Sequence, residues 1–232
     1  MKIKSILLGG LIISSSSLFA IEGMMDIDPH NYSKQVFTLG LLPGSSKIKS
    51  NDKSYYRVGL DLHNKASLKE LHYKKAEIFW QGGGGLFYYK GNGLEKQNVK
   101  FNIEFGLSSQ ISNIVSSVSV GGLYDYYSTT DNNNTTVSSG QVAPYIQGAI
   151  GTVFGKHEIG FIGTMYKYTK DYDGMNTLLN KPIKTEIKGV YTYRSSREIG
   201  VSFSPYYSII KDSSSKDEKE IGLNIMFTWA YR

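Results

Sequence analysis

The 232-residue sequence contains no cysteine, only two tryptophans and no long apolar run. The lack of cysteine excludes disulfides, thiolate metal sites, a cysteine nucleophile and a lipid anchor on an N-terminal cysteine. A membrane-spanning helix needs about 20 apolar residues, and the longest apolar run, residues 6–13, is far shorter. The four histidines are scattered without metal-ligand spacing, so we expect neither a metal nor another cofactor.

The short apolar run belongs to a predicted secretory signal peptide over residues 1–20. Lys2 and Lys4 precede the run, and small residues follow it up to a cleavage site near Ala20. An N-terminal membrane anchor is the alternative, and the length of the run excludes it. We therefore expect an exported protein.

The charge balance is mildly basic, with a formal net charge of +6. Two of the basic residues lie in the predicted signal peptide. A mild positive charge suits contact with anionic lipid head groups or lipopolysaccharide phosphates. Nucleic acid is not an expected partner, because the exported chain has no basic cluster interleaved with aromatics.

Residues 220–232 show the clearest pattern in the chain. Apolar residues occupy every second position: Ile221, Leu223, Ile225, Phe227, Trp229 and Tyr231. Small or polar residues lie between them, so the pattern predicts a β-strand with one apolar face. Residues 55–63, 99–107 and 197–210 alternate in the same way. We count about ten such strands, mostly of the length that a membrane-spanning strand needs.

The predicted connections alternate between long and tight. The long ones are residues 43–54, 91–98, 129–140, 170–181 and 211–219, and the tight ones include 108–114, 155–156 and 195–196. Outer-membrane barrels have short periplasmic turns and longer outer loops. Residues 64–73 do not fit, because this irregular segment should be a short turn. A run of four glycines, residues 82–85, indicates a bulge, a bend or a crowded interior; a phosphate-binding loop lacks its following helix.

The two faces of the strands carry different candidate residues. Aromatics predicted at the membrane interface are Tyr126, Tyr168, Tyr207, Trp229 and Tyr231. The opposite face predicts a polar network in the lumen, formed by Arg57, Asp61, Lys100, Glu104, Lys184, Glu186 and Lys188. In the first outer loop, Lys47, Lys49 and Lys53 are predicted to contact lipopolysaccharide phosphate.

These features resemble the small single-chain outer-membrane β-barrels of Gram-negative bacteria. Residues 221–229 also resemble the assembly signal of such proteins, which implies insertion by the barrel-assembly machinery. The expected fold is all-β, an antiparallel up-and-down transmembrane β-barrel of about ten strands, with eight or twelve as alternatives. The expected organisation is a signal peptide (1–20), a periplasmic tail (21–34) and a barrel in the outer membrane (35–232).

A barrel of this size is filled mainly by its own side chains, so a general porin is not expected. We expect a structural or surface-binding role through the outer loops. The alternatives are a narrow small-solute channel and a soluble periplasmic β-barrel that binds an apolar ligand. An enzyme is not expected, because His63 and His157 fall at predicted inner ends and no histidine falls near the outer rim.

Overall fold

The structure is a computed structural model. It describes residues 35–41, 43–48, 53–71, 76–131, 133–173, 178–196, 199–214 and 217–231. Within these ranges every regular element is a β-strand, and no helix is long and apolar enough to cross a membrane. The predicted signal peptide, its cleavage site near Ala20 and the periplasmic tail lie outside the described residues.

The sheet closes into a barrel because its first and last strands pair with each other. Strand β13 (Asp217–Tyr231) pairs with β12 (Ile199–Lys211) on one side and with β1 (Gln35–Leu41) and β2 (Gly44–Ile48) on the other. Both β1 and β2 also pair with β3 (Lys53–Leu71), so they are two parts of one interrupted strand. The described residues therefore form a closed antiparallel barrel of ten strands, which confirms the predicted fold class and strand number.

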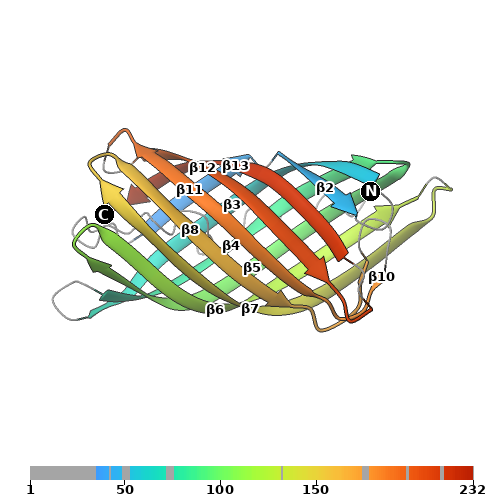
Figure 1. The fold of residues 1–232 in the computed structure, drawn as a ribbon, viewed down its shortest axis with the longest axis horizontal. Helices are drawn as coiled ribbons and strands as arrows, with labels where there is room; N and C mark the ends of the chain where they lie inside the picture. The colour runs from blue at the N-terminus through green and yellow to red at the C-terminus, as the bar shows by residue number, and fades with distance from the viewer. Residues whose placement is uncertain are drawn as a thin grey trace, which may run out of the picture.

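The remaining barrel strands follow in chain order and lie tilted across the barrel (Figure 1). They are β4 (Ala76–Gly91), β5 (Leu94–Ile111), β6 (Ile114–Thr130), β7 (Thr136–Phe154), β8 (His157–Lys167) and β11 (Ile183–Arg194). Between β8 and β11, the short strands β9 (Tyr172–Asp173) and β10 (Leu178–Leu179) form a separate hairpin. We call the end with the turns 112–113 and 155–156 the tight-turn end and the opposite end the loop end.

Three of the predicted long loops are wrong. In the first, residues 43–54, Gly44–Ile48 form β2 and Lys53 begins β3. Strands β4 and β5 continue to a two-residue turn at Asn92 and Gly93, whose φ angles of 49° and 76° suit a tight hairpin. Strands β6 and β7 likewise pair as far as Thr130 and Thr136. These strand ends have the polar composition of loops, and only their pairing identifies them as strands.

The irregular segment 64–73 is also corrected. Strand β3 continues to Leu71 and pairs with β4, with a register shift between Ser67 and Lys69. A β-bulge interrupts the two-residue alternation, which explains why this part of the strand had no clear pattern. Only residues 72–75 separate β3 from β4, so the connection is shorter than the predicted irregular segment.

The barrel is apolar outside and polar inside. On β5, Phe101 and Phe105 are 56% and 52% exposed on the outer surface, whereas Glu104 between them is fully buried inside. The other strands repeat this arrangement, which is that of a barrel surrounded by lipid. The alternative of a soluble barrel with an apolar ligand site inside is therefore wrong, because that protein would need the opposite facing.

Candidate functional site: the polar lumen

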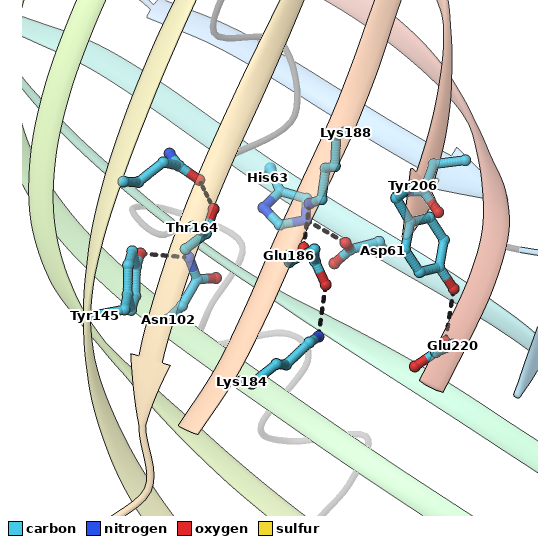
Figure 2. A network of polar contacts seen from close by, with 12 residues as sticks. Asp61, His63, Asn102, Tyr145, Thr164, Lys184, Glu186, Lys188, Tyr206 and Glu220 are labelled. Atoms are coloured by element: carbon cyan, nitrogen blue, oxygen red, sulfur yellow. Dashed lines mark hydrogen bonds and ion pairs between the residues drawn. The ribbon is translucent and has the colours of Figure 1, made fainter. Parts of the chain in front are cut away.

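An ion pair lies inside the barrel at the seam where β3 and β13 are brought together. Arg57 Nε on β3 lies 3.1 Å from Glu220 Oε1 on β13. The Tyr206 hydroxyl on β12 donates to the same oxygen at 2.6 Å (Figure 2). Gly44 makes room for this group, because a Cβ there would lie 2.9 Å from the Tyr206 oxygen. The seam thus contains a buried ion pair whose carboxylate also accepts a hydrogen bond from the Tyr206 hydroxyl.

A second charged group lies on β11, where three inward positions carry Lys184, Glu186 and Lys188. Glu186 Oε2 lies 2.6 Å from Lys184 Nζ, and its Oε1 lies 3.0 Å from Lys188 Nζ (Figure 2). All three side chains are buried. One carboxylate therefore pairs with two ammonium groups, both of its oxygens are engaged, and the group keeps one excess positive charge.

The glycine run explains a third pair. His63 Nε2 lies 2.5 Å from Asp61 Oδ2, and the two residues face Gly83 and Gly85 across the β3–β4 ladder. A Cβ at Gly85 would lie 2.8 Å from Asp61 Oδ1, and one at Gly83 would collide with the His63 ring. Of the three interpretations of the glycine run, the crowded interior therefore applies here, because the glycines leave room for Asp61 and His63. The prediction that His63 lies at an inner end is wrong, because β3 is longer than expected.

Glu104, on the inner face of β5, is hydrogen-bonded by neutral partners. The Tyr145 hydroxyl donates to Glu104 Oε2 at 2.7 Å, and Gln147 Nε2 lies 3.4 Å from Oε1. Thr164 donates to Gln147, and Asn102 donates to the Tyr145 hydroxyl (Figure 2). These hydrogen bonds join side chains of β5, β7 and β8, so they link three strands of the barrel wall on the inside.

A cavity of about 90 Å³ lies among these groups. Its wall includes Arg57, Lys100, Lys184 and Asn102, together with Tyr145. Since a single water needs about 10–15 Å³ of such space, the cavity suits several waters or a small solute. It is too small for an open aqueous pore.

The hairpin between β8 and β11 folds into the loop end of the barrel. Its residues Tyr168, Tyr172 and Leu179 are only 1%, 5% and 1% exposed. We call these three side chains the cover. They pack against Leu123, Tyr127, Ala143, Tyr145 and Ile210 of the barrel wall.

Polar contacts also hold the cover. Lys96 Nζ donates to the Tyr172 hydroxyl at 3.3 Å and lies 4.5 Å from the centre of that ring. The Tyr168 hydroxyl donates to Asp125 Oδ2 at 3.3 Å. The prediction that Tyr168 lies at the membrane interface is wrong, because Tyr168 continues the inward-facing alternate positions of Thr164 and Tyr166, and its backbone amide still bonds to the Pro182 carbonyl at 3.0 Å.

An apolar cluster lies inside the barrel nearer the tight-turn end than the cavity. Phe79, Ile162 and Val190 pack together and are nearly inaccessible to solvent. These three side chains lie on barrel strands, whereas the cover lies on a connection. Among the described side chains, packed apolar groups from elements of different kinds thus lie in the lumen on both sides of the cavity.

The structure places the other predicted site residues as follows. Six of the predicted lumen residues are buried inside and Lys100 is half-buried there. Tyr126 and Tyr207 are 41% and 40% exposed on the outer surface. The backbones of Trp229 and Tyr231 belong to β13, and those of Lys47 and Lys53 to β2 and β3. The side chains of these four residues, and Lys49 altogether, lie outside the described part of the structure.

Several lumen residues were absent from the predicted network, notably Asp125, Tyr206 and Glu220. Glu220 could have been found, because it shares its alternate position with Gly222 and Asn224 in the clearest strand of the sequence. Tyr206 and other buried tyrosines could not, because an aromatic residue suits either the lipid interface or a packed lumen.

No family model and no curated protein matches this chain. Among solved structures, the outer membrane protease OmpT from Escherichia coli matches with a TM-score of 0.51 and 9% identity, covering 85% of this chain and 96% of that one. The beta domain of the Bordetella autotransporter Brka matches with a TM-score of 0.51 and 7% identity, covering 86% and 100%. At these identities the likeness concerns the fold alone. The chain therefore has the fold of Gram-negative outer-membrane β-barrels, as the sequence resemblance predicted.

Proposed function

We propose that the protein is an integral outer-membrane β-barrel with a structural or surface-binding role at its loop end, and that its lumen does not conduct in this conformation. The observation that supports a surface role over a channel is the cover, which fills the loop end with buried aromatic and aliphatic side chains. The proposal assigns no catalysis to the barrel.

The proposed orientation places the tight-turn end in the periplasm. The hairpin of β6 and β7 supports this orientation, because it continues past the lipid-facing Tyr126 and Val142 as a polar ladder. Its hydroxyl groups pair across the strands, with Thr130 and Thr136 oxygens 3.0 Å apart. A polar hairpin that extends beyond the apolar surface suits the outside of the cell.

Outer-membrane lipid and lipopolysaccharide are the proposed partners, with Lys47, Lys49 and Lys53 as phosphate contacts. The register supports this assignment, because Lys47 lies opposite Lys219, two positions from the lipid-facing Ile221. Basic residues next to the apolar surface are well placed for lipid phosphates. Insertion by the barrel-assembly machinery belongs to the same proposal, since the stretch that resembles its signal forms the seam strand β13.

Membrane fractionation tests the location. We expect the protein to remain in the outer-membrane fraction after high-salt and carbonate washes, because its apolar surface faces lipid. Release into the soluble fraction would overturn the proposal. For the lipid contacts, replacing Lys47, Lys49 and Lys53 with Gln should reduce co-purifying lipopolysaccharide, whereas Lys156→Gln at the tight-turn end should not.

A narrow small-solute channel is the second candidate, and the polar cavity supports it. Planar-bilayer recordings separate the two. We expect the refolded protein to show no steady conductance, because packed aromatic and aliphatic side chains fill the lumen on both sides of the cavity. Steady, ion-selective current through the unmodified protein would favour the channel instead.

A further inference from the structure

The cavity wall carries more positive than negative charge. Its cationic residues are Arg57, Lys100, Lys184 and Lys188, and the neutral or cationic His63 joins them. Among the described carboxylates, only Asp61 and Glu186 line the same space. Glu220 and Asp125, which face Arg57 and Lys100, lie behind the lining. A solute in the cavity therefore meets mainly cations.

The two lining carboxylates already have donors. Both oxygens of Glu186 accept from lysines. Asp61 lies against His63 and also accepts from the Leu62 amide at 3.2 Å. An ammonium carries three donors, whereas a carboxylate with both oxygens engaged has little capacity left. The described part of the cavity wall therefore has more donor groups for a ligand that accepts hydrogen bonds than acceptors for a ligand that donates them.

Lys100 is the clearest donor towards the cavity. Its Nζ lies 4.0 Å from Asp125 Oδ2, which is beyond hydrogen-bond distance. Asp125 is fully buried and accepts instead from Asn98 and Tyr168. The Lys100 side chain is 17% exposed, compared with 0% for Asp125. Its ammonium therefore faces the open space more than its counter-ion does.

We propose that this cavity is a binding site for a small oxyanion of the carboxylate or phosphate type, with Lys100 as the main ligand and Arg57 and Lys184 beside it. This inference goes beyond the surface role proposed above. A volume of about 90 Å³ limits the ligand to a small ion. The site adjoins the cover, because Leu123 and Tyr145 belong both to the cavity lining and to the cluster around the cover, so access from the loop end requires the cover to move.

The absence of cysteine makes a clean test possible. Asn102→Cys places a single thiol on the cavity wall. The refolded protein is labelled with thiosulfonate reagents of similar size, one carrying a sulfonate and one a trimethylammonium group. We expect the anionic reagent to react faster by on the order of tenfold, since nearby unit charges act strongly inside a protein. Inorganic phosphate, and acetate in a parallel arm, should slow the anionic reagent, and the stronger competitor identifies the class of anion.

Two further variants complete the test. Lys100→Gln in the same background should remove most of the charge preference and the protection by phosphate, whereas Lys211→Gln, an exposed lysine at the loop end, should leave both unchanged. If the cover blocks labelling, the measurement is repeated with Tyr172→Ala. Equal rates for the two reagents, no protection by either anion, or no labelling with the cover variant would each show that the cavity holds only water.

Discussion

The triad on β11 gives the sharpest test of how the lumen is stabilised. Glu186 holds Lys184 at 2.6 Å and Lys188 at 3.0 Å, and all three side chains are buried. Glu186→Gln keeps the shape but leaves two ammonium groups close together without their counter-ion. Removing one partner of a buried ion pair costs about 3–5 kcal/mol. Because both lysines border a cavity that can admit water, we expect the lower value, about 3 kcal/mol.

Reversible unfolding in urea, with the protein refolded into lipid vesicles, measures this change. The midpoint should fall while the m-value, the slope with denaturant, stays the same. Adding Lys184→Gln to Glu186→Gln should recover part of the loss, since one unpaired charge is removed with it. Glu95→Gln is the matched control, because its pair with Lys90 is 46% and 67% exposed, and surface pairs contribute little. A loss below about 1 kcal/mol in Glu186→Gln would refute the view that this triad stabilises the lumen.

Three further predictions address the cover, the glycine run and the surface. Tyr172→Ala should introduce brief openings in bilayer recordings, because it removes the ring over which the Lys96 ammonium lies; recordings as quiet as those of the unmodified protein would show that the cover does not control access. Gly83→Ala should reduce the yield of heat-modifiable barrel on gels, because the new Cβ would lie 2.8 Å from a backbone oxygen, whereas Gly122→Ala should fold normally because its Cβ meets open space. Hydrogen bonds from Lys90 and Tyr88 hold the pKa of Glu95 below its usual range, so an NMR titration should show that this carboxylate protonates at lower pH than ordinary glutamates, and the shift should shrink in Lys90→Gln because the larger of the two hydrogen bonds is lost.

The facing of the strands was predictable because it depends only on a two-residue period. On β5, the alternation of Phe101 and Phe105 with Glu104 predicted which side chains face lipid and which face the lumen. The same logic brought Arg57 and Lys184 to the inside. It could not pair them with partners, because Arg57 reaches Glu220 only when the first and last strands of the barrel meet.

The errors have the same origin. Polar strand ends beyond the apolar surface, such as Glu95 to Asn98 on β5, look like loops until they are seen paired with β4 and β6. Tyr168 continues the aromatic pattern of β8, yet it shares the inward-facing alternate position of Thr164, and its hydroxyl donates to Asp125 inside the barrel. Composition does not distinguish these cases, because a tyrosine can satisfy its hydroxyl either at a membrane surface or inside a polar lumen.

By itself, therefore, the sequence determined the architecture: long alternating strands, an apolar surface for lipid and a charged interior. A local period can carry this information because every strand must present opposite faces to lipid and lumen. Only the tertiary structure decided which charges pair, how small the cavity is and that a connection folds inward to cover it. These features depend on ring closure and on side chains from many strands meeting in one space, so no local pattern in the chain contains them.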